Sequence, residues 1–292
     1  MFKQKAGAIE LEPIEGYDGH AIDGVIGYDF ISRFVVEIDY DKQVINLYDP
    51  HQYEYRGHGE IVPISLEGNI PKISASVILP DGQRVDGQFT IDTGARNALV
   101  LAKPFHEGHH MLDAVSRHID ASWGMGVGGQ SKETIGRIGS IQIGKLSLPD
   151  TLTNFSFDTR GAFADPDLNG NIGGELLRRF TVIFDYANKR MILEPNRHFN
   201  EPFDFDMSGL LIVAGGSDLR TFKVKNVVPN TPASEAKILE GDQIAAIDGR
   251  AAREFTLEQI RVLFRQDGQT HKLTIDRGGK QITATLKLRK LI

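Results

Sequence analysis

The chain has 292 residues, of which 40% are hydrophobic and 25% charged, and its formal net charge is −6. This length favours two or more domains, and the acidic balance argues against a nucleic-acid partner. The sequence contains no cysteine, which excludes disulfides, thiolate catalysis and cysteine-ligated zinc, and it has no apolar run of about eighteen residues that would predict a membrane span.

The first feature along the chain is an internal repeat. Residues 23–50 and 169–195 align without a gap at an offset of 146, so that Gly24 falls on Gly170 and Ile26 on Ile172. Each copy predicts a glycine-bearing strand end, a short helix and a two-strand hairpin that turns at DYDKQ or DYANK. Such matching indicates two copies of one structural unit.

The two copies differ in what precedes them. A long β-rich stretch containing Asp92 precedes the second copy, whereas only 23 residues precede Gly24. The same offset would place a counterpart of Asp92 roughly 55 residues before Met1. We therefore expect residues 1–55 to be the C-terminal part of a first lobe and residues 56–198 to be a complete second lobe. On this interpretation the first lobe is incomplete because of truncation, processing or a misplaced start codon. The alternative is a native half-size protein that obtains the counterpart of Asp92 by dimerising.

Residues 59–195 consist mostly of short runs of β-branched or alternating residues, separated by Gly, Pro and Asp. This pattern predicts closed or sandwiched β structure. One predicted strand runs into FTIDTGARN, where Asp92, Thr93 and Gly94 form either an Asp-initiated turn or a site. A second predicted hairpin has a glycine-rich arm, which suits close approach to a ligand. Its central residues are Met125, Gly126, Val127, Gly128 and Gly129.

The segment HEGHH at 106–110 matches the H-E-x-x-H pattern of zinc proteases. In that interpretation His106 and His110 bind the metal and Glu107 is the general base. Gly108 and Pro104 both weaken the required helix, and no third ligand follows at a suitable distance. We favour a solvated, histidine-rich first turn of a helix that continues through MLDAVSRHI, and we expect no metal site.

Residues 208–290 have a different character. Predicted strands flank the segment NTPASEAKILEGDQIAAIDG and an amphipathic helix, TLEQIRVLFRQ. This order of motifs resembles PDZ domains, and the resemblance implies a partly open β-barrel with two helices at 203–292. It also implies a loop that binds a peptide's C-terminal carboxylate and an apolar side-chain pocket. The loop would be Gly209, Leu210, Leu211 and Ile212, and the pocket Ile260 with Leu263 or Phe264.

The order of DTGA, the glycine-rich hairpin and Ile172-Gly173-Gly174 resembles the lobe of a retropepsin-like aspartic protease. The bacterial single-chain kind, with two lobes and a C-terminal PDZ domain, is the most similar. The resemblance implies a mainly β, acid-protease-like closed lobe, with Asp92, Thr93 and Gly94 as catalytic residues. Residues 125–129 would then cover the substrate. Two carboxylates about 3 Å apart share one proton in such enzymes and so supply an acid and a base together.

The sequence therefore leads us to expect an aspartic endopeptidase with a PDZ domain, without a cofactor, and inactive unless a second aspartate is supplied. Expected partners are a peptide or protein substrate, a C-terminal peptide ligand, and a second copy of the chain through the protease lobe. Ala95, where pepsin-like enzymes often carry Ser or Thr, predicts a pH optimum nearer neutral. The resemblance favours a periplasmic or otherwise exported protein, with a cytoplasmic one as the alternative. The main alternative function is an inactive peptide-binding adaptor, and a minor one is a zinc metallopeptidase.

Overall fold

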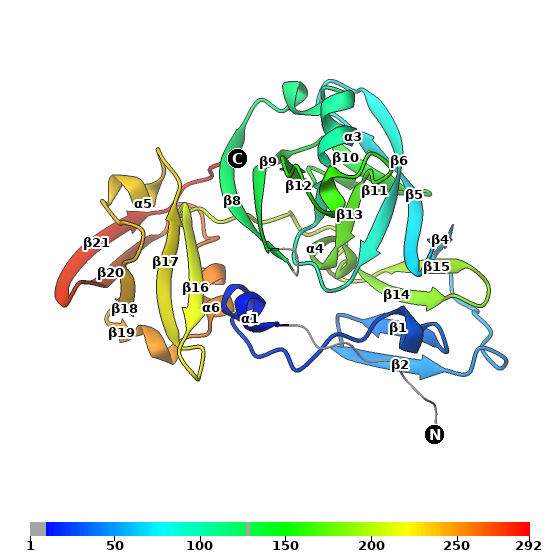
Figure 1. Ribbon diagram of the computed structural model, residues 1–292, viewed down its shortest axis with the longest axis horizontal. Coiled ribbons are helices and arrows are strands. Elements are labelled where there is room, and N and C mark those ends of the chain that lie inside the picture. Colours follow the sequence, from blue (N-terminus) through cyan, green and yellow to red (C-terminus); the bar gives the residue numbers. More distant parts are fainter. Residues whose placement is uncertain (1–9, 127–128) are drawn as a thin grey trace. The chain divides into compact units, whose positions relative to one another are not determined.

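The structure, a computed structural model, describes residues 10–126 and 129–292 (Figure 1). These residues form two compact units, each with its own hydrophobic core. The first unit comprises Ile26–His118 and Thr134–Phe203. The second comprises Asp204–Ile292 and the described residues of 6–25 and 119–133. Both units consist mainly of strands joined by short helices.

A five-stranded sheet of the first unit combines both copies of the repeat. Its strands are β1 (Val35–Asp39), β2 (Val44–Tyr48), β3 (Glu60–Pro63), β14 (Phe180–Asp185) and β15 (Arg190–Pro195). The order is β2-β1-β14-β15-β3, and the two copies meet where β1 pairs antiparallel with β14. Each copy therefore contributes one complete hairpin to the same sheet.

The two hairpins share single-residue details, which confirms the predicted repeat. Gln43 and Lys189, which are 146 residues apart, both adopt the left-handed conformation, with φ of 57° and 51°. The helices α2 (Tyr28–Ile31) and α4 (Gly174–Leu177) begin at equivalent positions before the hairpins. The predicted strand end exists only in the second copy, as β13 (Gly170–Gly173), because residues 24–27 belong to no strand.

The equivalent aspartates Asp39 and Asp185 hold these turns closed. Both side chains are buried, and each accepts a hydrogen bond from the backbone N–H three residues later. The donors are Lys42, at 2.9 Å from Asp39, and Asn188, at 3.2 Å from Asp185. The aspartate that the repeat matches in both copies thus stabilises the tight turn that follows it.

A second sheet, of ten strands, contains most of the remaining chain of the first unit together with β8 and β9, most of whose residues are counted with the second unit. Its strands are β4 (Ser65–Glu67), β5 (Ile70–Ile78), β6 (Arg84–Asp92), β7 (Leu99–Leu101), β8 (His118–Gly126), β9 (Gly129–Arg137), β10 (Ser140–Ile143), β11 (Leu146–Pro149), β12 (Leu152–Ser156) and β13. The order is β11-β10-β5-β6-β13-β7-β12-β9-β8, with β4 added on β5. The end strands β11 and β8 do not pair with each other, so the described sheet is open. The expected closed β lobe is therefore not formed.

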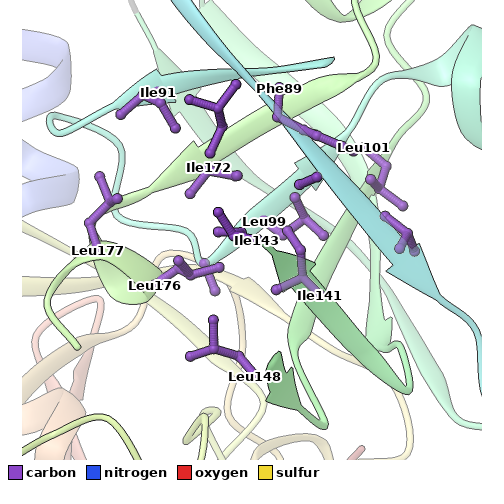
Figure 2. Packing of buried hydrophobic residues seen from close by; sticks show 14 of the residues in the cluster. Phe89, Ile91, Leu99, Leu101, Ile141, Ile143, Leu148, Ile172, Leu176 and Leu177 are labelled. Carbon is purple, nitrogen blue, oxygen red and sulfur yellow. The ribbon is translucent and has the colours of Figure 1, made fainter. Parts of the chain in front are cut away.

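The core of this unit lies where β6, β7 and β13 meet helix α4. Val85, Phe89 and Ile91 alternate with more exposed residues along β6, as expected for a strand with one buried face. Figure 2 shows Phe89 and Ile91 among Leu99, Ile172 and further apolar side chains. Leu176 and Leu177 of α4 are fully buried in the same cluster.

The helix expected to continue from HEGHH through MLDAVSRHI is not formed. Helix α3 spans Lys103–Gly108, a 3-10 turn covers Met111–Ala114, and β8 already begins at His118. His110 adopts φ of 52°, which is incompatible with a continuous right-handed helix. A further 3-10 turn spans Ala162–Ala164.

The second unit contains a six-stranded sheet. Its strands are β16 (Leu210–Gly215), β17 (Thr221–Val227), β18 (Gln243–Ile247), β19 (Arg250–Ala251), β20 (Thr270–Arg277) and β21 (Lys280–Lys287). The order is β16-β17-β18-β20-β21, with β19 on β18, so β16 and β21 are the two edge strands. A 3-10 turn spans Ala252–Glu254.

The helices of the second unit are α1 (Glu12–Asp18), α5 (Pro232–Glu235) and α6 (Leu257–Leu263). Helix α6 begins at a capping box, in which Thr256 accepts from the Gln259 N–H and the Gln259 side chain accepts from the Thr256 N–H. Within residues 10–126 and 129–292, no helix is both long and apolar enough to cross a membrane.

Candidate functional site

Asp92 is the last residue of β6, and its side chain closes a local turn. Its Oδ1 accepts a hydrogen bond from the Gly94 N–H at 3.0 Å, and its carbonyl accepts one from the Ala95 N–H at 3.3 Å. Asp92 and Thr93 are exposed. Within the described chain, the Gly94 bond is the one formed by the Asp92 carboxylate, and no second carboxylate is bonded to it. This geometry is that of an Asp-initiated turn.

The glycine-rich hairpin lies at the end of the second sheet. Met125 and Gly126 are the last residues of β8, and Gly129 opens β9 with φ of 104°. The tip residues Val127 and Gly128 lie outside the described residues. The strands β8 and β9 are neighbours in the sheet, as the sequence predicts.

His106 has a structural environment. Its ring is buried, and its Nε2 lies 2.7 Å from the Ser156 carbonyl oxygen. The ring also meets Phe155 and Phe157 edge-on, and burial lowers its pKa. His110 lies beyond the end of α3 and is exposed. The two histidines therefore do not share a helical face, and the zinc-protease interpretation is wrong, as is the expectation that His106 is solvated.

The residues predicted to bind a peptide lie together in the second unit. Leu210 and Ile212 of β16 share one core cluster with Ile260 of α6 and with Phe264, and Leu263 packs against this cluster. Leu211 is also buried. Strand β16 contacts α6, and its edge away from β17 has no strand partner within the described chain. An open strand edge beside a helix is the arrangement to which a peptide can be added as a further strand.

Asp206 organises the loop before β16 and was missed by the sequence analysis. Its Oδ1 accepts hydrogen bonds from the N–H groups of Ser208 and Gly209, at 2.9 and 2.7 Å, and from the Ser208 hydroxyl at 2.7 Å. The Ser208 hydroxyl oxygen in turn accepts from the Leu210 N–H at 3.0 Å. Side chains thus occupy amides that were expected to bind a ligand's carboxylate. The signal that was available is Asp-x-Ser-Gly, a pattern typical of such turns.

Burial raises the pKa of Asp206 to about 6, and the three hydrogen bonds to its carboxylate act in the opposite direction. The glycine that follows is required by geometry. Gly209 has φ of 79°, and a Cβ built there would lie 2.1 Å from the Thr231 hydroxyl oxygen. The conformation of the loop is therefore fixed on both sides, by the hydrogen-bonded carboxylate of the half-buried Asp206 and by a glycine that no larger residue can replace.

Comparison with known proteins identifies one family in the chain. Residues 204–288 match the PDZ domain family. No curated protein matches the sequence. Similar solved structures include the photosystem II D1 C-terminal processing protease, with 23% identity, coverage of 30% of this chain and 24% of that chain, and a TM-score of 0.27. The present chain thus spans about a quarter of that protease.

Two further similar structures align with a larger share of this chain than the processing protease does, at lower sequence identity. The HtrA-type protease AlgW with a decapeptide is 14% identical, with 78% of each chain covered and a TM-score of 0.29. The serine endoprotease from Yersinia pestis is 12% identical, with 88% of this chain and 76% of that chain covered and a TM-score of 0.29.

These findings correct the aspartic-protease prediction. The family match covers the PDZ domain alone, and none of the proteins named above is described as a retropepsin-like enzyme. An aspartic mechanism also needs a second carboxylate about 3 Å away, which the exposed Asp92 does not have within the described chain. The prediction of a bacterial retropepsin-like aspartic endopeptidase is therefore wrong.

The TM-scores are too low to transfer serine-protease activity either. A serine protease needs a histidine bonded to a serine hydroxyl and to a carboxylate. No histidine in the described residues makes both bonds; His106 bonds to a carbonyl, and His271 bonds to Asp248. What the family match and the structure support together is narrower: residues 204–288 form a PDZ domain, in a chain that is mainly β.

Proposed function

We propose that the chain is a peptide-binding adaptor whose PDZ domain captures the C-terminal residues of another polypeptide. The open edge of β16 beside α6 is the observation that supports this most directly. PDZ domains add the ligand as a strand to such an edge and hold its carboxylate with backbone amides. In this proposal β16 supplies the strand edge, and the carboxylate is held at Leu211 and Ile212, because side chains already occupy the Gly209 and Leu210 amides.

The proposed pocket is apolar. Ile260, Leu263 and Phe264 would contact the last side chain of the ligand, and they already pack with Leu210 and Ile212. Burial of an apolar terminal side chain would extend this cluster and contribute about 1.5–3 kcal/mol, whereas a charged one would lose its hydration there. We therefore expect preference for Val, Leu, Ile or Phe at the ligand's C-terminus.

Fluorescence anisotropy with the full chain tests this function. The probes are fluorescein-labelled decapeptides that differ only in the last residue, which is Val, Leu, Ile, Phe, Asp or Lys, and each has a C-terminally amidated twin. Apolar endings should bind at least about tenfold more tightly than charged ones, and amidation should weaken them at least tenfold, since tenfold is about 1.4 kcal/mol. Equal binding of acids and amides would contradict carboxylate recognition.

Hydrogen exchange with the tightest of these probes locates the site. The amides of β16 should exchange more slowly when the peptide is bound, because an added strand takes up its open edge. Strand β21 is the matched control, since it is the other edge of the same sheet. Protection that appears on β21 and not on β16 would contradict the assignment of the groove.

A further inference from the structure

Helix α1 lies against the two elements that flank the proposed groove. It contacts β16, and its C-terminal end contacts α6, which Figure 1 shows in blue beside the yellow and orange elements of the PDZ domain. Residues 10–25 belong to the same compact unit as the PDZ domain, although about 180 residues separate them from it in sequence. The contacts are made by backbone as well as by side chains.

Two glycines allow the close approach. A Cβ built on Gly16 would lie 3.0 Å from the Ala214 carbonyl oxygen of β16, so that the helix backbone lies directly beside this strand. A Cβ on Gly19 would lie 2.6 Å from the Cβ of Leu257, the first residue of α6. Gly19 also has φ of 83° and donates its N–H to the Glu15 carbonyl at the end of the helix. It therefore serves both as the helix cap and as a contact.

Arg261 holds the end of α1 from the α6 side. Its guanidinium donates to the carbonyl oxygens of Tyr17 and Asp18, the last two residues of the helix. Carbonyls at a helix C-terminus lack partners within the helix and carry partial negative charge, which favours a cation there. Leu257 and Arg261 are four residues apart and so lie on one face of α6. The sequence pattern indicated Ile260, Leu263 and Phe264 for the groove and did not indicate this face.

The Tyr17 side chain is half-buried. Its hydroxyl oxygen is shielded from solvent, and burial raises the pKa of the phenol. The described backbone hydrogen bonds of α1 run within residues 11–19, so the helix lies against β16 and α6 without being added to the sheet as a strand. A helix held in this way forms fewer hydrogen bonds with the domain than an added strand would.

We propose that residues 12–19 are an internal ligand of the PDZ groove, which an incoming peptide must displace. This inference rests on the proposed function, because it gives that binding site a built-in competitor. The fraction of molecules with an open groove would set the apparent affinity for any external peptide, since affinity falls in proportion to that fraction. Because α1 leaves the strand edge of β16 unpaired, a peptide that pairs with this edge has an advantage over it.

Two alanine substitutions in the same segment form a matched test in the full chain. Gly19→Ala places a Cβ against Leu257 and strains a left-handed residue, so it should release α1. Gly24→Ala is the control, because no atom lies within 4 Å of a Cβ at that position. Arg261→Gln replaces the charged guanidinium by a shorter, neutral amide and leaves α1 itself unchanged. This variant decides the outcome if Gly19→Ala merely frays the helix.

Hydrogen exchange gives a readout that needs no ligand. In the wild type and in Gly24→Ala, the amides of β16 should be protected, and in Gly19→Ala and Arg261→Gln they should exchange at least about fivefold faster. Amides of β20 should stay unchanged in all four proteins, which shows that the domain remains folded. Unchanged exchange of β16 in both release variants would overturn the proposal.

Binding in solution separates this inference from the proposed function. A labelled peptide copying residues 10–20, ELEPIEGYDGH, should bind Gly19→Ala at least fivefold more tightly than the wild type or Gly24→Ala. Equal affinity of this peptide for all three proteins contradicts the internal ligand, even if the decapeptides ending in Val bind well. A further outcome is that ELEPIEGYDGH binds Gly19→Ala more tightly than the other two proteins, while no decapeptide binds any of the three. That outcome would support the internal ligand and contradict recognition of a C-terminal carboxylate.

Discussion

At the scale of single residues, Asp206 shows how a half-buried carboxylate shapes the loop before β16. It accepts three hydrogen bonds from Ser208 and Gly209, and desolvation nevertheless raises its pKa from an ordinary 3.8 to about 6. Since an acid with a raised pKa holds its proton more tightly in the folded state, its favourable contribution is complete below about pH 4. This contribution is lost as the pH rises towards 6.

Asp206→Asn tests this argument, because it keeps a side-chain oxygen acceptor and removes the titration. The free energy of unfolding of the wild type, minus that of the variant, should fall by roughly 2–3 kcal/mol between pH 4 and pH 7, because a tenfold change in proton affinity corresponds to about 1.4 kcal/mol. Urea unfolding of both proteins at pH 4, 5.5 and 7 measures this difference. A difference that stays constant across the three pH values would show that burial does not raise the pKa of this carboxylate.

The sequence could predict some residue environments and not others. Asp92, Thr93 and Gly94 form a turn that the composition of DTGA already favours, and the same letters suggested an active site that the structure and the comparisons do not support. A short sequence motif does not specify whether a second carboxylate lies close to Asp92 in the folded protein. Asp206 escaped notice because its role depends on burial, which a four-residue pattern does not reveal.

At the scale of elements, β13 depends on glycine at both ends. It lies between β6, with which it pairs in parallel, and β7, with which it pairs antiparallel. A Cβ on Gly170 would lie 2.2 Å from the Val100 carbonyl oxygen, and one on Gly173 would lie 2.3 Å from the Asn97 carbonyl oxygen. Backbone atoms cannot move aside as a flexible side chain can, so neither glycine tolerates a methyl group.

The internal repeat supplies a control for this strand. Gly173→Ala should destabilise the first unit by about 1–3 kcal/mol through overpacking, whereas Gly27→Ala, its counterpart, should change stability by less than about 0.5 kcal/mol. No atom lies within 4 Å of a Cβ on Gly27. Thermal unfolding followed by circular dichroism compares the two variants. Equal shifts in melting temperature would mean that the close approach at β13 does not limit stability.

Elements were predicted unevenly from the sequence for a physical reason. The hairpins β1–β2 and β14–β15 were predicted correctly because their turns are set by local residues such as Asp39 and Asp185. The helix expected after HEGHH was predicted wrongly, because His110 adopts a left-handed conformation that cannot be predicted from its residue type. The open second sheet depends on the pairing of distant strands, and strand patterning alone leaves such pairing undetermined.

At the scale of the whole molecule, the repeat is the strongest conclusion from the sequence, and its two copies have different surroundings. Apolar residues of the first copy are exposed where their counterparts, 146 residues later, are fully buried. The pairs are Ile26 with Ile172, Phe30 with Leu176, Ile45 with Met191 and Leu47 with Leu193. The sequence alone could not predict this difference, because both copies have apolar residues at these positions, although only those of the second copy are buried.

This asymmetry has a consequence for solubility. Ile45 lies on the edge strand β2 and is 65% exposed, and an apolar edge strand favours association between molecules. Ile45→Lys should therefore reduce concentration-dependent light scattering, with little change in melting temperature. Met191→Lys places the same charge at the equivalent buried position and should abolish folding of the first unit, since an unpaired buried charge costs several kcal/mol. If Ile45→Lys also lowers the melting temperature by many degrees, the first-copy face is packed in solution, and the contrast between the copies is wrong.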